Sequence, residues 1–91
     1  MSDSFVDNAE RSRFEMTENG HLVYASYRIG EGQMIIPYVE ASMPLRGTGA
    51  ADRLMERVAG EARSRQLKVV PLCGYAAMWF RRHKAHHDLL E

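Results

Sequence analysis

The chain has 91 residues, with 12 lysine or arginine side chains balanced by 12 aspartate or glutamate side chains, so its formal net charge is zero. A chain of this length supports one small domain over residues 1–91, and balanced charge argues against nucleic acid or an anionic membrane as partner. A lone cysteine, Cys73, excludes an intrachain disulfide and favours a cytoplasmic protein. The first ten residues are polar and acidic, unlike a signal peptide, and no apolar run approaches the roughly 20 residues of a membrane span.

The first half of the chain has the pattern of β structure. Residues 1–12 lack periodicity, and we expect a flexible arm or the lead-in to a first strand. From Arg13 apolar and charged residues alternate, and Asn19-Gly20 supplies the two positive-φ residues of a tight hairpin turn. The strand that follows, over residues 21–29, is predicted to carry one apolar face made of Val23, Ala25, Tyr27 and Ile29.

A third β segment covers residues 33–41, after a glycine-rich turn at residues 30–32. Pro37 lies inside this segment, and a proline cannot donate a hydrogen bond to the ladder of a sheet. We therefore expect an edge position or a bulge near Pro37.

The second half of the chain is richer in helix. From Ala50 to Ala62 apolar residues recur at steps of three and four, which predicts an amphipathic helix reaching about Gln66. Residues 67–72 form a short buried strand in this interpretation, and a right-handed crossover would place it parallel to the strand before the helix. A second helix is predicted from Tyr75 to about Lys84, with Trp79 and Phe80 in the core.

The glycine-bearing segment 43–51, with the sequence MPLRGTGAA, joins the two halves. Gly47 and Gly49 lack a Cβ, so backbone N–H groups there can approach an anion closely. The helix that follows adds free N–H groups and the positive end of its dipole. This strand–loop–helix order indicates a pyrophosphate-binding turn.

These features together resemble the GNAT superfamily of acetyl-CoA-dependent N-acetyltransferases. Residues 46–51 fit its Arg/Gln-x-x-Gly-x-Gly/Ala signature through Arg46, Gly49 and Ala51. Over about residues 13–90 the chain is similar to short, single-domain GNAT-like proteins, which share the motifs at residues 13–14, 45–49, 68–73 and 80–83. The resemblance implies a truncated GNAT-like acyl-CoA N-acyltransferase fold of mixed α/β class. In that fold antiparallel strands precede a strand–helix–strand crossover and a C-terminal helix.

The resemblance also implies an enzyme that moves an acetyl group from acetyl-CoA to an amine acceptor, either a small molecule or a protein side chain. A coenzyme A-binding or protein-interaction module without turnover is the alternative. The pantetheine arm would enter where residues 38–41 and 69–72 splay apart, and the Val39 N–H would stabilise the oxyanion. The implied coenzyme-binding residues are Val39, Glu40, Ala41, Arg46, Gly47, Thr48, Gly49, Ala50, Ala51 and Cys73.

Two positions depart from the pattern of the superfamily. Phe80 stands where larger GNAT enzymes often carry a tyrosine that protonates the leaving thiolate, and Ile36-Pro37 replaces the His-Thr pair usual in the short proteins. Cys73 and Tyr75 remain as the candidate catalytic residues near the thioester. The simpler interpretation of Cys73 is a small buried residue that closes a strand.

A basic and histidine-rich segment follows the second predicted helix. Its simplest interpretation is a solvated helix end whose cations suit the helix dipole, and contact with coenzyme phosphates or an acidic partner is the alternative. No metal site is expected, because a further ligand with suitable geometry would be needed. The side chains concerned are Arg81, Arg82, His83, Lys84, His86 and His87.

Overall fold

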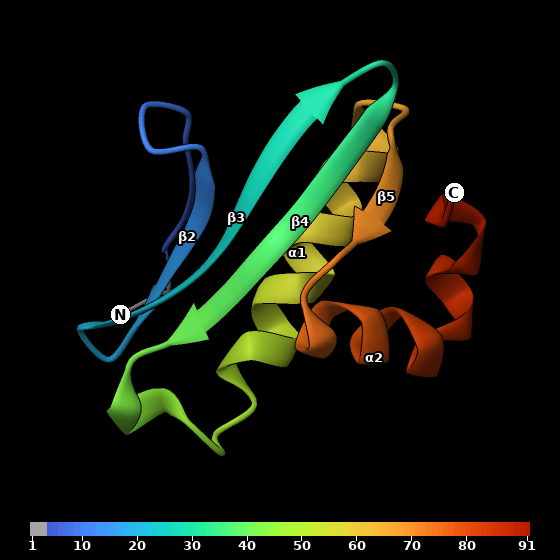
Figure 1. The fold of residues 1–91 in the computed structure, drawn as a ribbon. Helices are drawn as coiled ribbons and strands as arrows, with labels where there is room; N and C mark the ends of the chain where they lie inside the picture. The colour runs from blue at the N-terminus through green and yellow to red at the C-terminus, as the bar shows by residue number, and fades with distance from the viewer. Residues whose placement is uncertain (1–3) are drawn as a thin grey trace.

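The computed structural model describes residues 4–91, and it has the mixed α/β architecture expected from the sequence (Figure 1). Five strands form one sheet in the order of the chain: β1 Ser4–Asn8, β2 Arg13–Glu18, β3 His21–Gly30, β4 Gln33–Ala41 and β5 Lys68–Pro71. There are two α-helices, α1 Ala50–Ser64 and α2 Gly74–Arg82. A short 3-10 helix precedes α1, η1 Met43–Leu45, and another follows α2, η2 Lys84–Leu89.

The sheet is antiparallel from β1 to β4, and β5 runs parallel to β4. Helix α1 connects these two parallel strands, which confirms the predicted crossover. In Figure 1 α1 lies behind the sheet, and α2 follows β5 at the lower edge of the molecule.

Strand β1 decides between the two alternatives for the N-terminal segment. It pairs with β2 from Ser4↔Thr17 to Asn8↔Arg13, so these residues form a first strand and not a flexible arm. Residues 1–3 of that prediction lie outside the described residues. Asp7 fastens β1 to the rest of the fold by accepting hydrogen bonds from Tyr27 Oη at 2.5 Å and from Arg65 Nη2 at 2.6 Å.

The polar contacts of Asp7 shift two ionisations. Burial alone would raise the pKa of Asp7, but hydrogen bonds from Arg65 and Tyr27 outweigh it and hold the pKa below its usual value. Burial, together with the hydrogen bond to Asp7, raises the pKa of Tyr27 to about 12. The two shifts together favour a charged carboxylate beside a neutral phenol.

The turns and the irregularity of the sheet follow the sequence closely. Asn19 and Gly20 have φ values of +52° and +79°, as a tight hairpin between β2 and β3 requires. Between the pairs Ser26↔Tyr38 and Arg28↔Ile35, β3 advances two residues while β4 advances three. This extra residue is the bulge predicted near Pro37.

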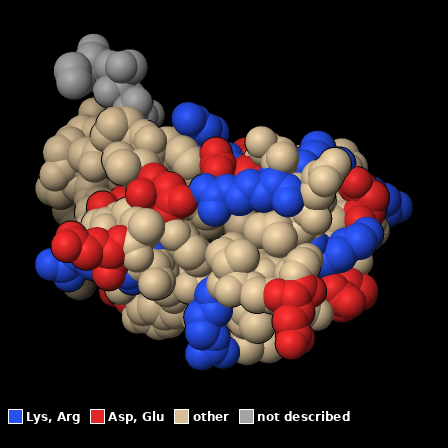
Figure 2. Space-filling view, turned by 90° about the horizontal axis from the view of Figure 1, so that it is seen from above, with Lys and Arg blue, Asp and Glu red and all other residues tan. Residues whose placement is uncertain are grey.

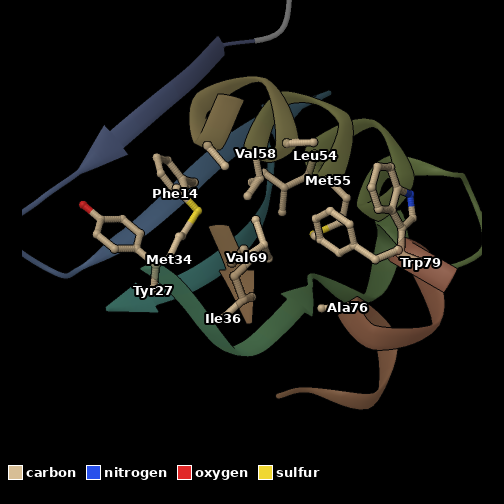
Figure 3. Packing of buried hydrophobic residues seen from close by; sticks show 14 of the residues in the cluster. Phe14, Tyr27, Met34, Ile36, Leu54, Met55, Val58, Val69, Ala76 and Trp79 are labelled. Carbon is tan, nitrogen blue, oxygen red and sulfur yellow. The ribbon is translucent and has the colours of Figure 1, made fainter. Parts of the chain in front are cut away.

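The core lies between one face of the sheet and the two α-helices (Figure 3). Trp79 and Phe80 are buried, as predicted, with exposed fractions of 3% and 0%. Ile29 lies on the predicted apolar face of β3, opposite the buried Met34, but it is 46% exposed because it is next to last in the strand, at the rim of the sheet. The largest fully buried side chains are Phe14, Val23, Met34, Ile36, Leu54, Met55, Val58, Val69 and Phe80.

The end of the chain lies along β5. Val69 forms a parallel bridge with Leu90, and the Glu91 N–H donates to the Val69 carbonyl at 3.4 Å. Leu89, just before the bridge, is buried in the core. The outer side of β5 is therefore partly paired by the chain itself. No helix in the described part of the chain has the length and apolar character needed to cross a membrane.

Candidate functional site

Strands β4 and β5 separate at Ile36. Their pairing runs from Gln33↔Lys68 to Ile36↔Pro71, and the Ile36 carbonyl then accepts hydrogen bonds from the N–H groups of Leu72 at 3.0 Å and Cys73 at 3.2 Å. Beyond this point β4 continues to Ala41 while the chain after β5 turns into α2. The two strands therefore open a gap, as the sequence analysis expected.

One boundary of the gap differs from the expectation. Residues 69–72 were expected opposite residues 38–41, but residues 69–71 pair with residues 34–36. The gap is bounded instead by residues 38–41 and by the segment after Pro71. The physical reason is that α1 delivers β5 opposite the start of β4, and side-chain periodicity fixes the face of a strand but not this register.

The bulge determines which backbone groups of β4 face the gap. The Ser42 N–H donates to Leu22 of β3 at 2.9 Å, and the Ala41 carbonyl accepts from Arg46 Nε at 3.0 Å on the other side. Because backbone groups alternate in direction along a strand, Val39 and Ala41 direct theirs away from β3. The Val39 N–H therefore points to the side on which β5 no longer pairs.

The glycine turn that follows is shaped to present N–H groups. Gly47 and Gly49 have φ values of +79° and +88°, and Gly49 is the N-cap of α1. Thr48 closes the turn: its Oγ1 donates to the Leu45 carbonyl at 2.5 Å and accepts from the Ala50 N–H at 3.3 Å. Among the described residues, none accepts a hydrogen bond from the N–H of Gly47, Gly49 or Ala51. These groups can bind an anion.

A salt bridge under the turn holds it in place, and the sequence analysis did not identify it. Arg53 donates to both carboxylate oxygens of Glu18 at 2.7 Å and to the Thr48 carbonyl at 3.2 Å. Glu18 is only 6% exposed, so this bidentate pair is partly desolvated. A Cβ at Gly49 would lie 3.0 Å from Arg53 Nη1, so both the conformation and the space at this position favour glycine.

A pocket of about 490 Å³ joins the gap and the turn. It brings together most of the predicted coenzyme-binding residues with predicted catalytic Tyr75. Thr48 and Cys73 are not among its lining residues, whereas Leu45 and Asp52 are additions that the sequence analysis missed. The lining residues are Val39, Glu40, Ala41, Leu45, Arg46, Gly47, Gly49, Ala50, Ala51, Asp52 and Tyr75.

The two predicted catalytic residues have different surroundings. Cys73 is the N-cap of α2, and its Sγ accepts a hydrogen bond from the Ala76 N–H at 3.5 Å, so the sulfur is directed to the first turn of the helix. Tyr75 lies in the pocket wall. Burial, with smaller contributions from the charges of Asp52 and Cys73, raises the pKa of Tyr75. Its hydroxyl therefore keeps its proton at neutral pH, as a proton donor must.

Charged side chains at the pocket mouth are largely paired. Arg46 turns back to β4, where its Nη2 lies 3.4 Å from Glu40 Oε2. The other carboxylate oxygen of Glu40 accepts a hydrogen bond from the Tyr38 hydroxyl. Figure 2 shows the molecule from above, over the end opposite the glycine turn, and there positive and negative side chains are interspersed. Because Arg46 is turned back to Glu40, the groups that the turn presents to the pocket are its backbone N–H groups more than a basic side chain.

The histidine-rich segment is only in part the solvated helix end that was expected. Arg81, Arg82, Lys84 and His87 are exposed, but the rings of His83 and His86 stack against Trp79, with centroids 3.9 Å and 5.6 Å away. Among the described residues no group of three or more His, Cys, Asp or Glu side chains is arranged to hold a metal ion.

Together, the splayed parallel strands, the glycine turn and the adjoining pocket define a small α/β protein with a cleft at the end of a parallel strand pair. Residues 13–89 match the family of GCN5-related N-acetyl-transferases, and the chain belongs to this family. Membership supports an acyltransferase-type activity in general. Among curated proteins, none matches the chain.

Proposed function

We propose that this protein is an N-acetyltransferase that moves the acetyl group of acetyl-CoA to an amine acceptor. The observation that carries the proposal is the single pocket that joins the unpaired side of β4, the N–H groups of the glycine turn and the Tyr75 side chain. A family that transfers acyl groups needs an anion-binding turn, a groove and a proton donor in one place. The residues that line this pocket support the proposal on all three counts.

The coenzyme fits the pocket by its chemistry. The pyrophosphate would accept hydrogen bonds from the N–H groups of Gly47, Gly49 and Ala51. The space beside Gly47 is open, because a Cβ at that position would meet nothing within 4 Å. The pantetheine arm would lie along Val39 and Ala41, whose backbone groups face the gap. Glu40, Arg46 and Ala50 complete the wall, while Thr48 and Cys73 act by shaping the turn and capping α2.

The bound coenzyme supplies the activated acetyl group as a thioester. The Val39 N–H donates a hydrogen bond to the oxygen that becomes negative as the amine attacks. As the C–S bond breaks, Tyr75 would give its proton to the departing thiolate, and the proton released by the attacking nitrogen would restore the Tyr75 phenol. Cys73, at the point where the strands separate, is the second candidate for this proton transfer.

A coenzyme-binding or interaction module without turnover is the second candidate function, and two observations favour it. Phe80, at the position of the usual tyrosine, has no proton to give and is fully buried. The Cys73 sulfur serves as a helix cap. Turnover measurements separate the two functions.

Thermal unfolding with coenzyme A tests the pocket. Ligand at about 100 times its dissociation constant adds roughly 2.7 kcal/mol, so the melting temperature should rise by about 10 to 20 °C. Gly49→Glu should abolish the rise, because it places a side chain and a negative charge at the turn. The matched control is Gly60→Glu on the exposed side of α1, where a Cβ would meet nothing within 4 Å. A wild-type protein that shows no rise with millimolar coenzyme would exclude the proposed site.

Incubation with acetyl-CoA and a panel of basic peptides and polyamines tests transfer. We expect a mass increase of one acetyl group on an acceptor, at a rate that Gly49→Glu reduces to the uncatalysed level. Coenzyme binding without transfer across the panel would instead support the interaction module.

A further inference from the structure

Asp52 connects the pocket to a histidine outside it. It lies in the first turn of α1 and lines the pocket, and its Oδ1 accepts a hydrogen bond from Trp79 Nε1 at 2.6 Å. The same oxygen lies 3.3 Å from His83 Nε2. One carboxylate of the pocket wall is thus held by two residues from the end of α2.

His83 is positioned between two hydrogen-bond acceptors. Its Nδ1 lies 2.7 Å from the Trp79 carbonyl, so both ring nitrogens face hydrogen-bond acceptors. An imidazole has one N–H when neutral and two when protonated, so only the cation can donate to both. The side chain is 31% exposed, which leaves it in contact with solvent protons.

His86 shows the opposite arrangement on the same tryptophan. Its Nε2 lies 3.0 Å from the Glu56 carboxylate, and its Nδ1 lies 3.1 Å from Arg63 Nη2, which can only donate. A neutral ring satisfies both contacts. The charged groups around His83 are Asp52 from α1 and its exposed chain neighbours Arg82 and Lys84. Glu56 and Arg63 contact His86, the other histidine on Trp79.

The charge of Asp52 extends into the pocket. After burial, Asp52 is the largest cause of the raised pKa of Tyr75. Asp52 follows directly after Ala51, whose N–H belongs to the anion-accepting turn. A carboxylate at this position opposes the binding of phosphate groups, unless a positive charge offsets it.

We propose that Asp52 and His83 form a titratable part of the coenzyme site that sets its affinity for anionic ligands. This inference rests on the proposed function. When His83 is protonated it neutralises Asp52, and the pocket binds an anion more tightly. When His83 is neutral the Asp52 charge remains, and binding weakens. Binding of the anion therefore takes up a proton, and affinity falls as pH rises through the range in which histidine loses its charge.

Calorimetric titration with coenzyme A at about pH 5.5 and about pH 8 tests this pair. His83→Gln should bind about fivefold more weakly than wild type at the lower pH and equally at the higher pH. Asp52→Asn should bind about fivefold more tightly than wild type at the higher pH, because it removes the carboxylate charge that opposes the phosphate groups. The amide oxygen can still accept from Trp79. His87→Gln, whose ring contacts the Arg81 carbonyl and not Asp52, is the matched control and should keep the wild-type response.

Proton uptake gives a second measurement, which does not depend on comparing affinities. At an intermediate pH the binding heat of wild type should vary with the ionisation enthalpy of the buffer, and that of His83→Gln should vary less. An unchanged pH response in His83→Gln, or weaker binding by Asp52→Asn at the higher pH, would overturn the inference alone. Absence of binding by wild type at both pH values would overturn the proposed function, and the inference with it.

Discussion

The two halves of β4 differ in almost every property, although they belong to one strand. Residues 33–35 are paired on both sides, with β3 and β5, Ile36 pairs with β5, and Met34 and Ile36 are fully buried. Residues 38–41 are paired with β3 alone, and Tyr38 is 49% exposed. The bulge at Pro37 separates the halves. It also changes which backbone groups face β5, so the same interruption ends the ladder and turns the Val39 N–H toward the pocket.

This division separates stability from chemistry within nine residues. Paired backbone and buried side chains in the first half stabilise the domain. In the second half the Val39 N–H faces the gap, where a ligand can bind it. Substitutions in the two halves should therefore change different measurements.

The largest effect is expected in the first half of β4, where the strand pairs with β5 (the closed half); the second half, beyond the bulge, is the open half. Ile36→Ala removes a fully buried side chain between the sheet and the helices and should destabilise the fold by about 2 to 5 kcal/mol. For a domain of this size that lowers the melting temperature by about 10 to 20 °C or more. The control is Ile29→Ala, at a position 46% exposed, which should change stability by less than about 1 kcal/mol. Similar losses in both variants would contradict the assignment of Ile36 to the core.

In the open half a backbone change should affect transfer more than stability. Val39→Pro removes the N–H that faces the gap, and proline is tolerated where that group has no partner in the ladder. The rate of acetyl transfer should fall by about a hundredfold or more, as expected for loss of an oxyanion donor. Unfolding in denaturant should show a loss of only about 1 kcal/mol. A variant with full activity would remove Val39 from the mechanism.

Substitutions of Tyr75 and Cys73, across the gap from β4, test which of the two residues donates the proton. If Tyr75 protonates the thiolate, Tyr75→Phe should lower turnover by about a hundredfold with little change in coenzyme affinity. Cys73→Ala should then keep most of the turnover. The reverse result would transfer the role to the thiol, and Cys73→Ser would show whether its acidity or its capping bond matters. Steady-state kinetics with saturating coenzyme distinguish these outcomes.

The smallest effect is expected in β1, the N-terminal edge strand of the sheet. Asp7→Asn should cost about 1 kcal/mol at neutral pH, because it loses a charged hydrogen bond to Arg65. The pKa of Asp7 is lower in the folded protein, so its contribution is full above the unfolded value of about 3.9 and is lost as pH falls through the folded value. The difference between variant and wild type should therefore disappear in acid, as followed by thermal unfolding. A difference that persists below about pH 2 would point to packing instead.

Much of this architecture could be predicted from the sequence, because the signals are local. The Asn19-Gly20 turn, the bulge at Pro37 and the glycine turn each depend on the conformational limits of a few residues. The amphipathic pattern of α1 fixed its buried face, and the crossover fixed the direction of β5. These features place most of the pocket wall.

The remaining features depend on contacts between distant residues. Asp52 meets Trp79, 27 positions later, and Arg53 meets Glu18, 35 positions earlier. No spacing rule indicates such partners, and the register of β5 is likewise set by packing of α1. Cys73 could have been recognised as a candidate cap from its place before a helix, but cysteine is not among the usual capping residues.

The bridge between Leu90 and Val69 has a consequence for the behaviour of the protein in solution. An exposed edge strand is a template on which a second chain can add, because its unpaired N–H and C=O groups are open to pairing. Leu90 and Glu91 occupy part of that edge, so fewer backbone groups of β5 are left for a second chain to pair with. Removal of residues 90–91 should therefore increase the tendency to aggregate, visible as light scattering at concentrations where the full chain stays clear.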